Sequence, residues 1–111
     1  TEVDSVSATG CGISNNPGKS TSPALVISPD GTPYIAWQDD SSGNVEIYVR
    51  AWDGSSWEEV GAGSATGGGV SNNPGSSTHP SLAIAPDGIP YVAWVDDSSG
   101  TAKVYILRFV K

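Results

Sequence analysis

The sequence predicts an all-β protein built from two copies of one four-stranded unit, and three observations carry this prediction. Gly, Ser, Pro, Asn and Asp dominate the composition, and no long run of helix-forming residues is present. When each residue is placed against the one 57 positions later, about 30 of the 54 aligned pairs are identical. Short alternating runs rich in β-branched and aromatic residues are separated by turn residues in both copies.

The first two predicted strands of the unit cover residues 24–28 and 33–38. A Ser-Pro-Asp-Gly turn joins them, because Pro presets one backbone angle and Gly accepts a left-handed one. The second strand ends at an Asp-Asp-Ser-Ser-Gly-Asn loop. In the second copy, the first strand at residues 81–85 is small and apolar on both faces, which suits the crowded inner strand of a radial sheet.

The third predicted strand covers residues 45–52, where apolar side chains alternate with charged or aromatic ones, and it ends at Asp53-Gly54. The fourth covers residues 57–60 and leads into a Gly/Ser/Asn-rich connection of about 18 residues, which is long for a compact domain. Four consecutive antiparallel strands with a long return predict a β-propeller blade. One blade cannot bury both faces of its sheet, so the blades must stack in a ring.

The ends of the sequence predict an assembly of several copies. The second copy runs through its third strand at residues 103–109, whereas Glu2-Val3 aligns with Glu59-Val60 in the fourth strand of the first copy. We therefore expect residues 1–6 to form the outer strand of a neighbouring blade, residues 7–63 a linker and the first blade, and residues 64–111 a linker and a second blade without its fourth strand. Rings of four to eight blades are usual, and a homotrimer with six blades is the expected form. A fragment of a longer tandem array is the alternative.

Composition also bears on partners and compartment. The formal charge of −7 argues against nucleic acid or an anionic membrane as a partner, because both would repel the chain. No membrane span or signal-peptide pattern is present. Cys11 is the only cysteine, so no intrachain disulfide is possible. The compartment is undetermined, with secretion favoured, and no cofactor is predicted.

The Ala-Trp-Asp-Gly-Ser-Ser-Trp segment at residues 51–57 and the two-blade length resemble the fucose-binding lectin propellers of bacteria and fungi. Some of those proteins build six blades from three two-blade chains. The resemblance implies a sugar held between blades by an Arg, a Glu and an aromatic residue. Those strands place Glu before Arg-x-Trp, but this chain has Val49 before Arg50-Ala51-Trp52, so the sugar site departs from the pattern. The Pro-Asp-Gly-x-Pro-Tyr-x-Ala-Trp pattern is similar to repeats in uncharacterised bacterial propellers.

The loops after the second and fourth strands are expected to emerge on one rim of the ring. Amide, hydroxyl and carboxylate groups beside indole rings suit sugar recognition. In the other interpretation, the polar residues cap turns and the tryptophans form the core between blades. Calcium bound by the paired aspartates is a further alternative, but the loop offers too few oxygens for a metal site to be predicted. The candidate ligand-binding residues are Asn15, Asn16, Thr21, Trp37, Asp39 and Asp40, with their counterparts Asn72, Asn73, Thr78, Trp94, Asp96 and Asp97.

The sequence therefore predicts a non-enzymatic, lectin-like binding module whose partners are further copies of itself and glycans. The alternative is a structural, self-assembling propeller fragment or an engineered propeller without a small ligand. Glycosidase chemistry is not predicted, because it needs two carboxylates facing each other across a cleft and the adjacent Asp39 and Asp40 point apart.

Overall fold

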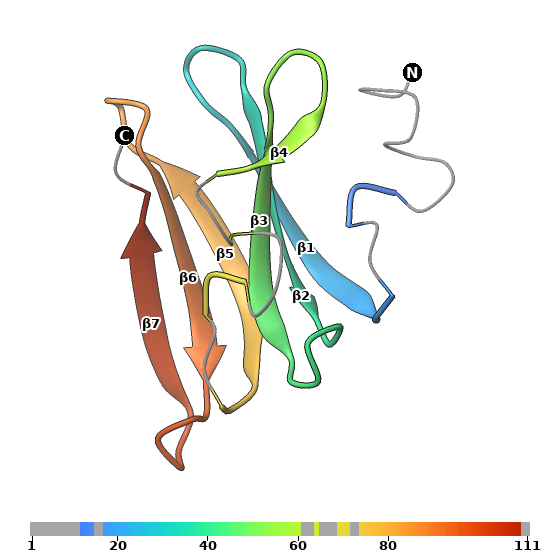
Figure 1. Cartoon of the computed structure of the whole chain (residues 1–111). Helices are drawn as coiled ribbons and strands as arrows, with labels where there is room; N and C mark the ends of the chain where they lie inside the picture. Colours follow the sequence, from blue (N-terminus) through green and yellow to red (C-terminus); the bar gives the residue numbers. More distant parts are fainter. Residues whose placement is uncertain (1–11, 15–16, 61–63, 65–68, 72–73, 110–111) are drawn as a thin grey trace.

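The computed structural model describes residues 12–14, 17–60, 64, 69–71 and 74–109, and this part of the chain is all-β. Its first antiparallel sheet has the order β1-β2-β3-β4, and its second has the order β5-β6-β7 (Figure 1). The described residues include no helix long and apolar enough to cross a membrane. The first sheet contains β1 (Ser20–Ile27), β2 (Pro33–Asp39), β3 (Glu46–Trp52) and β4 (Trp57–Glu59), and the second contains β5 (Ser77–Ile84), β6 (Pro90–Asp96) and β7 (Lys103–Arg108).

The all-β prediction and the seven strands that fall within the described residues are confirmed, with one systematic difference. β1 and β5 each begin four residues earlier than predicted, at Ser20 and Ser77. In both strands the pairing register shifts before the predicted start, and the residues Ser22 and His79 take left-handed φ values of 55° and 56°. The strands therefore continue through a β-bulge. The predicted outer strand at residues 1–6 lies outside the described residues.

Hairpin turns close one end of both sheets. The Pro-Asp-Gly turns have left-handed glycines, with φ of 89° at Gly31 and 87° at Gly88. Their amides donate to the carbonyl oxygens of Ser28 at 2.9 Å and Ala85 at 2.8 Å. A shallow hollow lies between the two turns, so they are neighbours at one rim of the molecule. The loops between β2 and β3 and between β6 and β7 lie at the opposite end (Figure 1).

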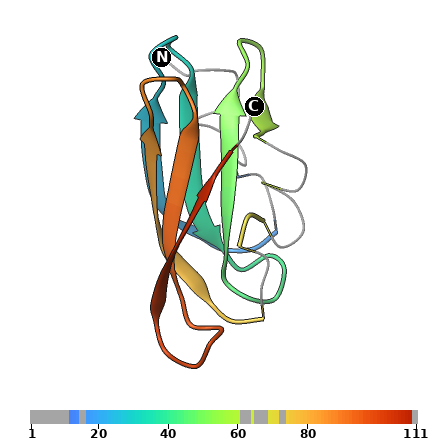
Figure 2. The ribbon, with the colours of Figure 1, turned by 90° about the vertical axis from the view of Figure 1, so that its left-hand side faces the viewer.

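The two sheets pack face to face around one apolar core. Residues on one face of β2 and β3 meet residues on one face of β5 and β6. Viewed from the side of the second sheet, β6 and β7 lie in front of the first sheet (Figure 2). The buried core residues are Tyr34, Ala36, Ile47 and Val49 from the first sheet and Leu82, Val92 and Trp94 from the second.

The packing is head to tail, because the two sheets contribute different faces. Ile47 and Val49 of the first sheet are fully buried in the core, whereas their counterparts Val104 and Ile106 are 78% and 68% exposed on the outer face of the second. The opposite holds for leucine: Leu82 of the second sheet is buried, and its counterpart Leu25 is 61% exposed. Each sheet therefore presents to solvent the face that its repeat partner uses for packing.

Candidate functional site

Each repeat has a polar rim, formed by the β2–β3 loop in the first repeat or the β6–β7 loop in the second, together with the segment that precedes β1 or β5. The amide of Lys19 donates to Asp40 Oδ1 at 2.7 Å, and the amide of Ser76 donates to Asp97 Oδ1 at 2.7 Å. The glycines beside these amides lie against the same loops. The structure thus brings together the two segments that the sequence places on one rim.

Within this rim, the first aspartate of each pair is a buried loop cap. Asp39 accepts hydrogen bonds from the Ser41 amide at 2.8 Å, from the hydroxyls of Ser20 and Ser41, and from Trp37 Nε1 at 3.3 Å. Asp39 is 1% exposed. Its carboxylate closes the loop in the manner of an Asx turn, so its oxygens serve the fold.

The second repeat has the same arrangement around Asp96, which is fully buried. Asp96 accepts from the Ser98 amide at 2.8 Å, from the Ser98 hydroxyl, and from Ser77 Oγ at 2.5 Å. Asp40 and Asp97, in contrast, are exposed. Of the four predicted aspartates, these two therefore present their side chains to solvent.

The two predicted tryptophans lie in the packed layers and not on the open rim. Trp94 is 6% exposed and stacks on Tyr105, with ring centroids 6.2 Å apart. Trp37 is 3% exposed and stacks on Tyr48 at 5.9 Å, with Ile13 and Ile35 packed against the pair. Burial of both indoles favours a packing role: Trp94 lies in the core between the two sheets, and Trp37 lies in a separate cluster on the other face of the first sheet. The remaining predicted residues Asn15, Asn16, Asn72 and Asn73 lie outside the described residues.

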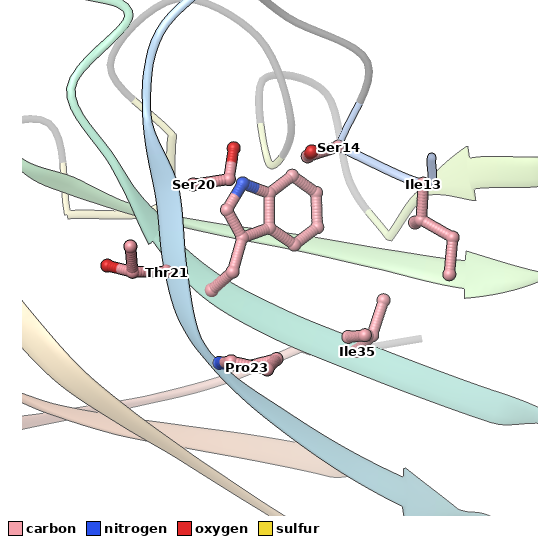
Figure 3. A pocket seen from close by; sticks show the side chains of 7 residues that line it. Ile13, Ser14, Ser20, Thr21, Pro23 and Ile35 are labelled. Carbon is pink, nitrogen blue, oxygen red and sulfur yellow. The ribbon is translucent and has the colours of Figure 1, made fainter. Parts of the chain in front are cut away.

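Thr21 and Thr78, the last two predicted residues, differ in exposure in the way that head-to-tail packing implies. Thr78 is half-buried, and Thr21 is exposed beside Ile35 and Trp37 on the first sheet. There Thr21 lines a pocket of about 220 Å³ that the sequence did not predict. The pocket lining is mostly apolar, with hydroxyls at one end (Figure 3). Its lining residues are Ile13, Ser14, Ser20, Thr21, Pro23, Ile35 and Trp37.

Two titratable groups near these loops have shifted pKa values. Burial raises the pKa of the Tyr48 phenol; a hydrogen bond with Ser42 opposes the shift, and the nearby Asp39 and Glu46 carboxylates add to it. In the β3–β4 turn, the Ser56 and Ser55 amides lower the pKa of the exposed Asp53, since both donate to its Oδ1 at 2.8 Å. Asp53 is thus the turn-forming residue that its Asp-Gly context predicts.

Among the described residues, no group of three or more His, Cys, Asp or Glu side chains could hold a metal ion. Comparison of the chain with family models, curated proteins and solved structures finds no match. The geometry of the two repeats is therefore the basis of the functional argument. Two features stand out: the polar rim with Asp40 and Asp97, and the exposed apolar faces of β1 and β7.

Proposed function

We propose that this chain is a non-enzymatic, self-assembling β-propeller module whose copies stack head to tail until a ring closes. One observation carries the proposal: the two free faces of the molecule are repeats of the two faces already joined in its core. Among the described residues, the large apolar side chains that remain exposed all lie on β1 and β7. They are Leu25, Ile27, Val104, Tyr105, Ile106 and Leu107.

The internal contact supplies the template for the contact between copies. Leu82 packs against the face of the first sheet that contains Ile47 and Val49. A second copy offers Leu25 in place of Leu82, while the first copy offers Val104 and Ile106. Apolar patches of this kind on both free faces mark an interaction surface. Because the two patches differ, the contact is heterologous, and repetition produces either a closed ring or an open filament.

Energetics favour the closed ring over an isolated pair. Full burial of a Leu, Ile or Val side chain contributes about 1.5–3 kcal/mol, and one contact between copies buries only a few such side chains. Association costs about 4–15 kcal/mol in lost translational and rotational freedom. In a ring, a leaving copy must break two contacts at once, so closure stabilises the assembly. Four to eight blades correspond to two, three or four chains, and we expect three.

Light scattering and sedimentation velocity test the assembly. At micromolar concentration we expect about three times the chain mass of 11.3 kDa. Ile106→Lys should give monomers, because it places a charge in the apolar contact, whereas Ser55→Lys in the exposed β3–β4 turn should assemble normally. A monodisperse monomer for the unsubstituted chain at all concentrations would contradict the proposal.

Carbohydrate binding is a second candidate function, and one observation supports it. Every repeat presents an exposed aspartate on the rim, Asp40 or Asp97, so the ring would carry several equivalent shallow sites that gain by avidity. Carboxylates are suitable acceptors for sugar hydroxyls. The buried indoles leave this site without the stacking surface that the sequence suggested. A glycan array probed with the assembled protein, with and without calcium, is the direct test.

A further inference from the structure

The internal contact is the packing of the two sheets within one chain. Polar side chains at one end of it indicate which groups would meet at the proposed contact between copies. Glu46 is 2% exposed, and its Oε1 accepts from Ser71 Oγ at 2.6 Å and lies 3.2 Å from Ser77 Oγ. Ser77 Oγ also lies 2.5 Å from Asp96 Oδ2. The Ser77 hydroxyl has a single proton, so it can donate a hydrogen bond to only one of these two buried carboxylates at a time. Two acidic side chains, one from each sheet, therefore meet at this corner of the internal contact.

The free face of the first sheet carries the same groups without the glutamate. The counterparts of Ser71, Ser77 and Asp96 are Ser14, Ser20 and Asp39. The Ser20 hydroxyl donates to the Asp39 carboxylate, as Ser77 does to Asp96. Ser14 and Ser20 line the same end of the pocket beside Trp37, and Pro23 and Ile35 line the other end (Figure 3).

The counterpart of Glu46 is Lys103, which begins β7 and is exposed. The pairing position is unchanged, because Glu46 pairs with Asp39 in the first sheet and Lys103 pairs with Asp96 in the second. The repeat thus replaces an acidic residue by a basic one at the position that faces the serines in the internal contact. If a second copy docks as the second sheet does, Lys103 meets Ser14, Ser20 and Asp39 of that copy.

We propose that the Lys103 ammonium group of one copy enters the Ser14–Ser20 end of this pocket on a second copy and forms a charge-assisted link to its Asp39. This inference rests on the proposed head-to-tail assembly and names its specificity contact. An ammonium group has three donors and no acceptor, so it donates to the Ser14 and Ser20 hydroxyl oxygens while the Ser20 hydroxyl keeps donating to the Asp39 carboxylate. The contact between copies then has a basic side chain at the position where the internal contact has the acidic Glu46.

The same docking fills the apolar part of the pocket. In the internal contact, Ile47 and Val49 pack against Val92 and Trp94. Between copies, Val104 and Ile106 take the places of Ile47 and Val49, and they meet the counterpart residues Ile35 and Trp37. The pocket is therefore a socket for the first residues of β7 from a second copy.

Substitution of Lys103 tests this contact without disturbing the fold of the single chain, because the side chain is exposed. Dissociation constants of the assembly would be measured by sedimentation velocity for Lys103→Met, Lys103→Glu and the control Lys19→Met, at low and high salt. Lys19→Met removes the same charge at an exposed position that does not line the pocket. We expect Lys103→Met to raise the dissociation constant about tenfold or more, since a hydrogen bond to a charged group is lost.

Lys103→Glu should weaken assembly further than Lys103→Met, because it places a carboxylate beside Asp39. The control should change assembly little, and salt should weaken the unsubstituted protein more than Lys103→Met. If Lys103→Met assembles as tightly as Lys19→Met, or if Lys103→Glu assembles more tightly than Lys103→Met, the proposed link is wrong while the ring stands. If the unsubstituted chain does not assemble, the proposed function itself fails.

Discussion

At the scale of single residues, identical side chains at equivalent positions of the two repeats differ in burial and in hydrogen bonding, because their surroundings differ. Ser77 is fully buried and bridges two carboxylates, whereas Ser20, its counterpart, is exposed and bonds to Asp39. Leu82 and Leu25 differ in the same direction. In each pair the second repeat is covered by the first sheet, and the first repeat faces solvent. Ser20 and Leu25 are therefore exposed at positions where their counterparts are covered by another sheet.

Glycine in the Asn-Asn-Pro-Gly segment has a purely spatial role. A Cβ on Gly75 would lie 2.5 Å from Asp97 Oδ1 and 2.6 Å from the backbone of Ser98. Without a clash, Gly→Ala usually stabilises a protein by about 0.4–1 kcal/mol. We expect Gly75→Ala to lower the free energy of unfolding by about 1–3 kcal/mol, because overpacking forces the backbone apart. Chemical denaturation measures this difference.

Two variants make the Gly75 prediction specific. Gly18→Ala should cost a similar amount, since its Cβ would lie 2.5 Å from the Ser41 amide nitrogen. Ser76→Ala keeps the amide that donates to Asp97 and should change stability little. Stabilisation by Gly75→Ala would show that the connection and the β6–β7 loop are not held together as described.

At the scale of elements, alternation and turn residues predict each of the seven strands but not where β1 and β5 begin. The Thr-x-Pro segments contain a proline that cannot donate to a ladder, so sequence rules place it outside a strand. The structure keeps the segment in the strand by means of a bulge at Ser22 and His79. At the second bulge, the His79 amide donates to Gln38 Oε1 of the first sheet at 3.1 Å. A contact between sheets thus fixes a local conformation that local sequence does not reveal.

The candidate site was predictable in part for the same reason. The pairing of the Asp-Asp-Ser-Ser-Gly loop with the end of the connection follows from strand order, and it is observed. The division of labour between Asp39 and Asp40 does not follow, because it depends on which carboxylate faces Ser20 across the β1–β2 pairing. The pocket was missed because its walls come from three separate segments, residues 13–14, 20–23 and 35–37, and local sequence does not show that they meet. The sequence does contain one signal for this pocket: Glu46 of the first repeat is replaced by Lys103 at the same position of the second.

At the scale of the whole molecule, the arrangement of the faces determines which kind of contact the proposed assembly would use. A two-fold dimer joins one patch to itself, whereas the observed packing joins a β5–β6 face of the second sheet to a β2–β3 face of the first. In the part of the chain that the structure describes, β7 is the counterpart of β3 at the edge of the second sheet, and it presents Val104 and Ile106 on the free face of that sheet. An exposed apolar edge strand invites pairing with another chain. In the proposed assembly, head-to-tail stacking would cover this face in every copy only if the ring closes.

Head-to-tail stacking makes a prediction that a two-fold contact cannot satisfy. Leu25→Lys blocks the face on β1, and Ile106→Lys blocks the face on β7. Each variant alone should remain monomeric, because every contact needs one intact face of each kind. An equimolar mixture still contains one intact pair of faces, so it should form a one-to-one dimer and nothing larger, detected by sedimentation velocity or native mass spectrometry. With only one contact, this dimer should dissociate at much higher protein concentration than the closed ring. A mixture that stays monomeric at high concentration, or that forms larger species, would show that the two faces do not join in the way the internal core does.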